Sequence, residues 1–598
     1  MQVKRATKGL PPLTFHQEKG LYESDVKLYF HGDFEMYLIR ESFQIFDNNN
    51  FATAWITTAL MEAYRLGDSP KPSEEQIFMS VEAMSQYYNK NVNYTNSIQN
   101  FWPQAYNSSL RAWQSTPQNL LDLFDLSYGV PWDTFFRILE DLGQQELVKT
   151  LKSLLADRDL FRNAFMIPPD FDDTFVNLGI GSLLQEVSSD FPQSSKLWKE
   201  KNSNLTSVFD ALKKYAYRPM SNDSKVNSID PRTYMYLHPF LEEAMTRNED
   251  IALVPTWVQD TDEVRTGFYS GVDMPFNINN VDVTVAANTI YGITNAVLTG
   301  LVNSSLLDDP EIQQVYLNTS NMIAFEIKTN FTNRKDLALT YYPSEFEFYW
   351  FVARTYHQLQ YYERIMPLHP VQERIRISLG AALCGRMTDH LLDSYMAETD
   401  GSIYYDDFLG DGDFNSKNVS EIRAEDRIFT TAMAVNALLT TWTVYNDVTK
   451  KLEWTSDTHY RVIDTVTRAV HWLNKNVLNP TYRPWNAFFS GSVKGSHTLP
   501  FEYPFNRLEF LNGTKIPDHD HFPRGATIIG MQGVQSPAWY KAEIKKTHFG
   551  YKVPTEFKGY NTDNAGFFPF WSSVPYTYVS TLLALSKFNN VEQKPVFE

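Results

Sequence analysis

The sequence predicts an all-α protein, a single large α/α toroid of about six helix hairpins joined by long loops. A repeated pattern of polar residues followed by an apolar helix, amphipathic helices between the repeats, and scarce strand patterning support this prediction. Of the 598 residues, 43% are hydrophobic and 15% aromatic, which is enough for a large buried core. We expect an N-terminal extension over residues 1–24 and one toroid domain over residues 25–598.

Five segments share a cluster of Asp or Asn followed by a helix rich in Thr, Ala and Gly. They begin at Asn48, Pro169, Asn279 and Glu425, with a looser copy at Asn561 that reaches a helix at 576–585. Asp, Asn and Thr side chains accept hydrogen bonds from the free N–H groups at helix N-termini, where acids also complement the helix dipole. A helix that is apolar nearly all round belongs in a protein interior. The repeats therefore predict capped interior helices.

Helices with one apolar face lie between these repeats. A capping-box start at Ser73–Gln76 and an apolar stripe over 462–473 mark two of them. Others are expected at 205–215, 310–326 and 372–396, and aromatic-rich helices begin at Arg232 and at Ser344, the latter with a capping box to Glu347. Alternating interior and amphipathic helices close naturally into a ring around a central cavity. Long loops are expected at 97–131 and 478–568.

Charge and cysteine content exclude several classes of function. A net charge of -18 argues against nucleic acid as a partner, because such binding depends on Lys and Arg neutralising phosphates. The single cysteine, Cys384, excludes an intramolecular disulfide and a multi-thiolate zinc site. The longest uncharged run, 283–307, has too many polar residues to span a membrane. Neither a nucleic acid nor a membrane span is predicted, and a small molecule or glycan is the expected ligand.

The expected location is secreted, with a cytoplasmic protein as the alternative. The N-terminus shows no apolar signal-peptide core. Chance would give roughly five N-x-[ST] sequons in this composition, whereas the chain has nine, at Asn93, Asn107, Asn204, Asn222, Asn303, Asn318, Asn330, Asn418 and Asn512. A mature chain without its signal peptide would explain both observations.

The second repeat contains the segment Pro168-Pro-Asp-Phe-Asp-Asp-Thr174. It resembles the DxDD motif of class II terpenoid cyclases, and Asp282-Val-Thr284 resembles a degenerate copy. The resemblance implies an α/α-toroid fold and proton-initiated cyclisation of an isoprenoid-type substrate. It further implies that Asp172 is the acid and that Asp170 and Asp173 tune it.

Adjacent carboxyl groups suit this chemistry because like charges cannot all ionise, so that one group keeps its proton. Aromatic side chains around a cavity would stabilise carbocations by cation–π contact, and the segment 346–351 offers Phe346, Phe348, Tyr349, Trp350 and Phe351. The competing interpretation is that residues 170–174 form only the N-cap of one repeat.

Two further functions remain open. If the interior helices all point the same way, their acids gather at one rim of the toroid, and the candidates are Asp172, Asp173, Asp282, Glu425, Asp426 and Asp563. Two carboxylates across a sugar-binding cleft are the minimal requirement for glycoside hydrolysis, which makes a secreted carbohydrate-active hydrolase or lyase the second hypothesis. The third is a non-catalytic secreted binding or structural glycoprotein whose acids serve only as helix caps.

Two segments have the spacing of metal ligands. Asp411, Asp413 and Asn415 alternate as in calcium loops but lack the EF-hand Gly and Glu, so the alternative is a solvated acidic turn. His519 and His521 could face one way on an extended segment, although an ordinary polar loop has the same pattern. Calcium is the one candidate ion, and no organic cofactor is indicated.

Overall fold

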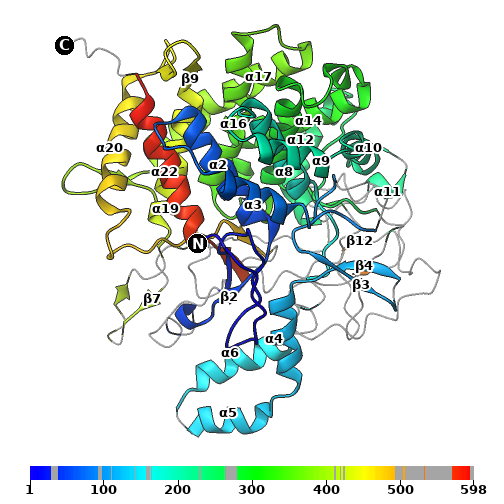
Figure 1. The fold of residues 1–598 in the computed structure, drawn as a ribbon, viewed down its shortest axis with the longest axis vertical. Helices are drawn as coiled ribbons and strands as arrows, with labels where there is room; N and C mark the ends of the chain where they lie inside the picture. Colours follow the sequence, from blue (N-terminus) through cyan, green and yellow to red (C-terminus); the bar gives the residue numbers. More distant parts are fainter. Residues whose placement is uncertain are drawn as a thin grey trace.

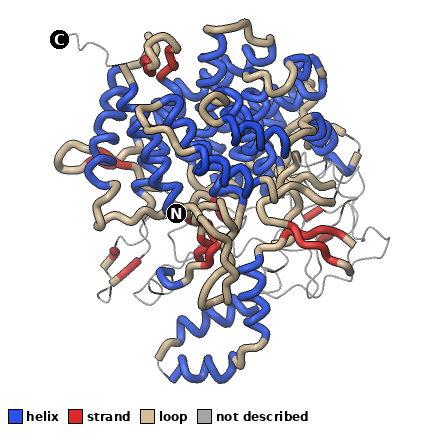
Figure 2. Tube along the Cα trace, viewed as in Figure 1, coloured by secondary structure: helices blue, strands red, loops and turns tan. Residues whose placement is uncertain are grey.

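The computed structural model is mostly helical (Figures 1 and 2). It describes residues 1–28, 38, 40–91, 97–109, 111–141, 143–156, 162, 165–221, 223–227, 231–260, 263, 279–333, 335–407, 409, 413–415, 417, 419–421, 425–491, 503–504, 531–532 and 569–592.

Six helices buried on nearly all sides form the centre of the protein. They are α2 (Asn50–Leu66), α8 (Phe171–Glu186), α13 (Val283–Leu298), α16 (Glu345–Glu363), α19 (Arg427–Trp442) and α22 (Val574–Asn590). Helix α2 packs against α8 and α22, α13 packs against α8 and α16, and α19 packs against α16 and α22. Five of these helices follow the predicted repeats, and α16 begins after Ser344 as its capping pattern indicates. The interior helices are confirmed.

A second group of helices buries one face against the first. It comprises α3 (Glu74–Met84), α9 (Pro192–Lys201), α10 (Thr206–Tyr215), α14 (Pro310–Thr329), α17 (Pro370–Ala382) and α20 (Tyr460–Asn476). Helix α3 packs on α2, α9 on α8, α14 on α13, α17 on α16, and α20 on α19 and α22, whereas α10 packs on α14. The predicted amphipathic helices are therefore confirmed. The helix expected at 372–396 is interrupted by a π-helical turn at Leu383–Met387 before α18 (Thr388–Asp393).

One long helix and several short ones lie outside these two groups. They are α11 (Ser224–Asn227), α12 (Pro231–Thr246), α15 (Lys335–Ala338) and the 3₁₀ helices η1 (Ser304–Asp308) and η2 (Asn330–Asn333). Helix α12 confirms the expected start near Arg232.

The prediction of a long loop at 97–131 is wrong in part. The strands β3 (Gln104–Asn107) and β4 (Ala112–Ser115) form an antiparallel hairpin, and α4 (Gln118–Tyr128) follows. Together with α5 (Trp132–Asp141) and α6 (Gln145–Ala156), α4 projects from the helical body (Figure 1). The apolar residues of α4 at 120, 121, 123, 124 and 126 recur at helical spacing, a signal that the polar surroundings obscured.

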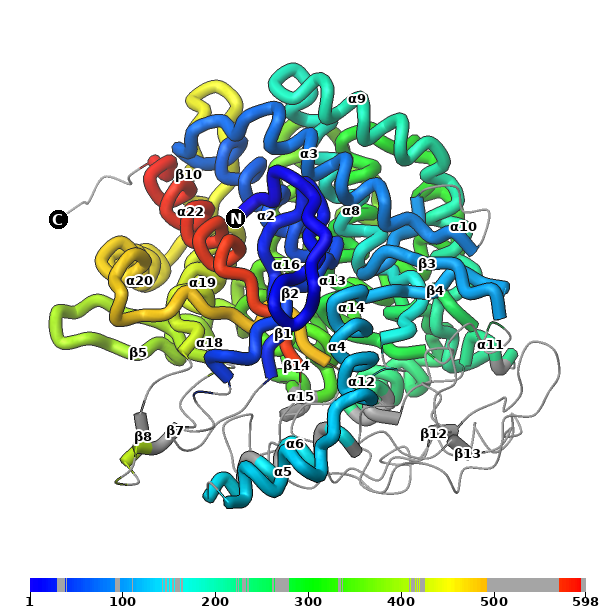
Figure 3. Tube along the Cα trace, turned by 60° about the horizontal axis from the view of Figure 1, so that its bottom comes forward, coloured from blue at the N-terminus to red at the C-terminus, as the bar shows by residue number. Residues whose placement is uncertain are grey.

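Strand β1 (Asp25–Leu28) joins distant parts of the chain in a four-stranded antiparallel sheet. It pairs with β14 (Pro569–Ser572) and with β2 (Ile45–Phe46), and β14 also pairs with β11 (Phe489–Ser490). In this register Val26 lies opposite Trp571, and Figure 3 shows the three strands β1, β2 and β14 together. The sheet places the segment before α22 beside the start of α2.

The remaining strands form two-stranded sheets. They are β5 (Met396–Ala397) with β6 (Ile403–Tyr404), β7 (Asp413–Phe414) with β8 (Ser420–Glu421), β9 (Thr443–Asn446) with β10 (Lys451–Trp454), and β12 (Tyr503–Pro504) with β13 (Met531–Gln532).

Candidate functional site

The DxDD-like turn begins α8 and is buried. Asp170 is the N-cap, and its Oδ1 accepts a hydrogen bond from the backbone N–H of Asp173 at 2.7 Å. The exposed fractions of Asp170, Asp172 and Asp173 are 4%, 4% and 2%. The capping interpretation therefore applies to Asp170, whereas the carboxyl groups of Asp172 and Asp173 do not cap the helix.

Asp172 connects three of the central helices through its hydrogen bonds. Its Oδ1 accepts from the side-chain amide of Asn288 on α13 at 2.8 Å, and its Oδ2 accepts from the hydroxyl of Tyr342, just before α16. By contrast, Oδ1 of Asp173 has no hydrogen-bond partner among the described residues. Asp172 is thus held in a fixed orientation, and Asp173 carries the unpaired oxygen.

The electrostatics of this turn favour the protonated acids. Burial raises the pKa of Asp170 to about 7. Burial and then the neighbouring Asp170 raise the pKa values of Asp172 and Asp173 well above their ordinary range. The hydrogen bonds from Tyr342 and Asn288 offset part of this rise at Asp172. Desolvation and like charges both disfavour the ionised form, so both favour protonated acids in this turn.

A fourth buried acid, Glu347, lies in the first turn of α16. Its Oε1 accepts from the hydroxyl of Tyr576 on α22 at 3.0 Å, and its Oε2 has no partner among the described residues. Burial and then Asp172 among its charged neighbours raise the pKa of Glu347 well above its ordinary value. Ser344 caps α16 as expected, but the carboxyl of Glu347 bonds to Tyr576 instead of completing a capping box. In the sequence, the one sign of a role for Glu347 was a carboxyl group within the aromatic segment 346–351.

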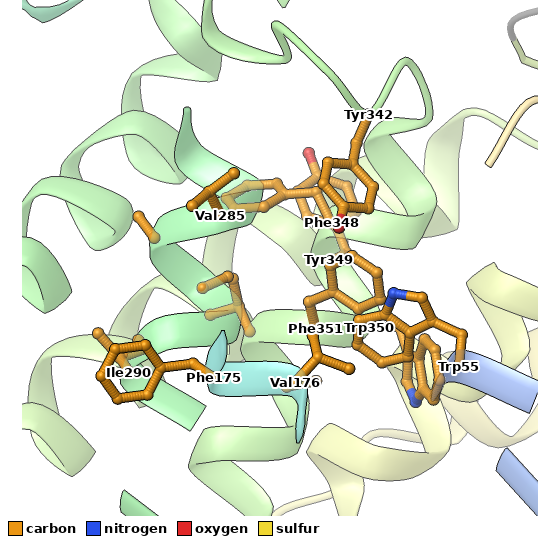
Figure 4. Close-up of a cluster of buried hydrophobic side chains, with 14 of the residues drawn as sticks. Trp55, Phe175, Val176, Val285, Ile290, Tyr342, Phe348, Tyr349, Trp350 and Phe351 are labelled. Atoms are coloured by element: carbon orange, nitrogen blue, oxygen red, sulfur yellow. The ribbon is translucent and has the colours of Figure 1, made fainter. Parts of the chain in front are cut away.

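Trp55, Tyr342 and Phe351 belong to a cluster of buried hydrophobic side chains (Figure 4). The rings of Trp55 and Phe351 stack with centroids 4.2 Å apart, and Tyr342 meets Phe351 edge-on at 5.5 Å and Phe51 at 5.3 Å. Because Tyr342 also bonds to Asp172, the acidic turn adjoins a large aromatic cluster. Of the predicted aromatic segment, Phe351 contacts Tyr342, whereas Phe346 packs against Tyr405 and His390.

Asp282 serves as the N-cap of α13, as its place in the repeat predicts. Its Oδ1 accepts from the backbone N–H groups of Thr284 and Val285 at 2.7 and 3.2 Å, and its Oδ2 accepts from that of Tyr341 at 2.8 Å. Burial raises its pKa, and these hydrogen bonds offset part of the rise. Backbone N–H groups therefore donate hydrogen bonds to both carboxyl oxygens of Asp282.

Replacing Asp282 by alanine should lower the free energy of unfolding by about 2 kcal/mol or more, because three buried N–H groups would lose their acceptor. Urea titration measures this change. Asp309→Ala is a matched control, because Asp309 caps α14 at the surface through Glu311 and Ile312. It should cost about 1 kcal/mol. Equal losses of unfolding free energy in both variants would show that the buried hydrogen bond from Tyr341 contributes nothing to stability.

Glu425 and Asp426, the acids before α19, have other hydrogen-bond and charge partners than the Asp170–Asp173 turn. Oε1 of Glu425 accepts from the backbone N–H of Arg483 at 3.0 Å and borders a cleft of about 540 Å³ that Tyr482 and Tyr578 also line. Asp426 lies beside Asp406, and burial followed by this neighbour raises its pKa well above the ordinary value. Glu425 and Asp426 therefore do not contact the Asp170–Asp173 turn directly.

The predicted ion sites are mostly outside the described residues. These include Asp411, His519 and His521, and the side chain of Asp413 is likewise not described. Asp563, a predicted acid of the toroid rim, also lies outside the described residues. The side-chain oxygen of Asn415 accepts from the backbone N–H groups of Lys417 and Val419 at 2.9 and 3.1 Å, which closes the β7–β8 turn. Among the described residues, acids, histidines and cysteine form no group of three that could hold a metal ion. Calcium binding remains a prediction.

The long uncharged run becomes α13 and the turn that follows it. Over the described part of the chain, no helix is long and apolar enough to cross a membrane. Five sequons are described, and among them only Asn303 is exposed. The amide oxygen of Asn318 instead accepts from the backbone N–H of Ala252 at 3.1 Å. Secretion remains a prediction.

The buried acid Asp47 predicts a pH dependence of stability. Its carboxylate accepts from the indole N–H groups of Trp102 and Trp571, yet burial raises its pKa to about 6. A folded-state pKa above the unfolded value means that folding binds protons. The contribution of Asp47 is therefore greatest at low pH and falls by about 3 kcal/mol in total as pH rises from about 3 to 7.

Asp47→Asn should remove this part of the decline when unfolding is measured by urea titration at several pH values. The exposed carboxylate Asp210 on α10 offers a control, because Asp210→Asn should leave the decline unchanged. An identical pH profile for Asp47→Asn and the unmodified protein would exclude the effect.

No protein-family model matches the chain, and neither a curated protein nor a solved structure is significantly similar to it.

Proposed function

We propose that the protein is an acid-catalysing enzyme of the α/α-toroid class, with α2, α8, α13, α16, α19 and α22 as the inner ring. Asp172 is the proton donor, and Asp170 and Asp173 keep it protonated. The observation that carries this proposal is the burial of three carboxyl groups on a single turn, beside aromatic rings. A carboxylic acid that stays protonated at neutral pH is what general acid catalysis needs.

The pairwise contacts of the six helices support the ring, because each packs against two others and α22 returns to α2. The hydrogen bonds of Asp172 to Asn288 and Tyr342 place the N-terminal parts of α8, α13 and α16 together. Glu347 and Tyr576 add α22 at the same end. The reaction site is therefore at the N-terminal end of the ring.

The resemblance of residues 168–174 to the DxDD motif favours an isoprenoid-type substrate. Proton transfer to an alkene or epoxide generates a carbocation, which the faces of aromatic rings stabilise. The rings of Phe51, Phe351 and Phe489 contact that of Tyr342, and Trp55 stacks on Phe351.

A second substrate class is favoured by Glu347. It lies on a different helix from Asp173, and each of the two has an unpaired carboxyl oxygen among the described residues. An acid and a second carboxyl on opposite sides of a substrate are the arrangement used for glycoside hydrolysis. A secreted glycoside hydrolase or lyase is the alternative, and a non-catalytic binding or structural glycoprotein is the third.

Turnover assays on the purified full-length protein test the proposal. Squalene, geranylgeranyl diphosphate and a panel of p-nitrophenyl glycosides represent the two substrate classes. We expect turnover in one class and its loss in the Asp172→Asn, Asp173→Asn double variant. Turnover that survives in the double variant would contradict the proposal, and no turnover of either class would favour the binding protein.

A further inference from the structure

An apolar cavity lies between the four-stranded sheet and the projecting arm, which consists of α4, α5 and α6 (Figure 1). The cavity has a volume of about 220 Å³. Val26 of β1 and Ile45 of β2 line it from the sheet, whereas Leu123, Trp132 and Leu155 line it from the three helices of the arm. Among the described residues that line it, none belongs to the Asp170–Asp173 turn. The cavity is therefore separate from the proposed acid site.

The side chains that line this cavity suit a hydrocarbon. Ser127 and Trp132 are the two described lining residues whose side chains can donate hydrogen bonds, and the others are apolar. The hydroxyl of Ser127 donates to the backbone oxygen of Phe124 at 2.6 Å, and the indole N–H of Trp132 donates to the backbone oxygen of Ser127 at 2.8 Å. Both donors are therefore already paired. A polar ligand group would lose its hydrogen bonds to water here without comparable replacement, which favours an apolar ligand.

The size of the cavity indicates a ligand rather than a packing fault. Protein interiors contain few voids larger than a water molecule, because the atoms that line a void lose van der Waals contacts. An apolar cavity of about 150 Å³ is enough to bind benzene. The larger volume of this cavity has room for an alkyl chain of medium length. Leu123 and Leu155 are only half-buried, so an occupant would remove more of their apolar surface from water.

Apolar side chains on the outer surface of the arm support a lipid as the ligand. Phe135 and Ile138, three residues apart on α5, are 42% and 53% exposed, and Leu126 on α4 is 50% exposed. The ring of Phe135 meets that of Trp132 edge-on, with centroids 5.8 Å apart, and Trp132 lines the cavity. Exposed apolar side chains that gather in one region mark surfaces that contact lipid, ligand or protein. The exposed apolar surface thus continues into the cavity wall.

The charge of the arm favours an uncharged head group. Residues 118–156 include six acidic and three basic residues. A carboxylate or phosphate head group at the cavity would meet this excess of negative charge, whereas a hydroxyl group would not.

We propose that the cavity binds the alkyl chain of an uncharged lipid, such as a fatty alcohol. This binding site is independent of the acid mechanism, because it shares no lining residue with the Asp170–Asp173 turn.

Isothermal titration calorimetry of the full-length protein tests the inference, with 1-hexanol, 1-octanol, 1-decanol and sodium decanoate as the probes. Leu123→Trp fills part of the cavity with a larger apolar side chain. Leu126→Trp is the matched control, because Leu126 lies three residues later on α4 and is not among the residues that line the cavity. Thermal unfolding without ligand shows whether each variant folds.

We expect saturable binding of the alcohols to the unmodified protein and to Leu126→Trp, with about fourfold tighter binding for each CH₂ group added between 1-hexanol and 1-octanol. Leu123→Trp should bind 1-decanol at least about tenfold more weakly, because its indole takes the space of several CH₂ groups. Decanoate should bind more weakly than 1-decanol. No saturable binding, an affinity that does not depend on chain length, equal binding by Leu123→Trp, or tighter binding of decanoate would overturn the inference.

Photolabelling of the unmodified protein provides a second test that does not require Leu123→Trp to fold. A 1-decanol analogue with a diazirine at the chain end should label peptides from β1, β2 or residues 118–156, and excess 1-decanol should prevent this labelling. Labels confined to other parts of the chain would contradict the inference. Sedimentation of the protein with phosphatidylcholine vesicles, without binding of free 1-decanol, would also overturn it, because the arm would then contact a bilayer surface instead.

Discussion

Asp172→Asn is expected to reduce turnover by about 100-fold or more, because asparagine keeps the shape of the side chain but cannot release a proton. The amide can still bond to Tyr342, and Asn288 can still donate to its oxygen, so the fold should be retained. The loss should therefore appear in kcat, with an unchanged melting temperature as evidence of a folded protein.

Tyr342→Phe serves as the companion variant. The hydrogen bond from Tyr342 lowers the pKa of Asp172, so its removal should raise that pKa further and shift the pH–rate profile upward. A catalytic role for Asp172 predicts that this variant keeps activity with an altered profile. If Asp173→Asn abolishes turnover while Asp172→Asn retains it, the proton donor is Asp173, whose oxygen is unpaired.

Glu62→Gln is expected to lower the free energy of unfolding by about 3–5 kcal/mol, the usual cost of breaking a buried ion pair. Glu62 on α2 pairs with Arg354 on α16 at 2.6 Å, and the ammonium of Lys587 on α22 is 4.0 Å away. All three side chains are buried, and the guanidinium of Arg354 lies 3.8 Å from the ring of Tyr291. Without the carboxylate, two buried cations would have no counter-charge in this group.

Urea titration measures this loss, and Glu82→Gln is the control. Glu82 pairs with Lys19 at the surface, at 3.4 Å, so its replacement should cost less than about 1 kcal/mol. A loss below about 1 kcal/mol for Glu62→Gln would show that the ion pair does not hold α2, α16 and α22 together. The same variant should lower the pKa of Lys587 further, because burial already lowers it to about 8 and Glu62 opposes that shift.

The sequence predicted features that depend on neighbours along the chain. Asp170 and Asp282 were expected as N-caps, and both accept from backbone N–H groups within three residues. The fifth repeat was less accurate, because α22 is capped by Ser573, whereas the predicted Asp563 lies outside the described residues. Helical periodicity and capping depend on residues close together in the sequence, which explains why the sequence alone predicted them.

The site required contacts between residues far apart in sequence. Asp172 and Tyr342 are 170 residues apart, and Glu347 and Tyr576 are 229 apart. No local pattern relates such pairs, so the sequence could name Asp172 but not its partners. The charges Glu62 and Arg354 were visible within otherwise apolar helices, yet only the packing of α2 near α16 shows that they neutralise each other.

The protonation state of the Asp170–Asp173 turn is the most direct test of the proposed acid mechanism. Infrared difference spectroscopy of protein labelled with carbon-13 aspartate would compare the unmodified protein with Asp172→Asn at pH 7. We expect a carboxylic acid C=O band in the unmodified protein that Asp172→Asn lacks, because burial and Asp170 raise the pKa of Asp172 well above its ordinary value. Carboxylate bands alone at pH 7 would contradict it, since an ionised Asp172 cannot be a proton donor.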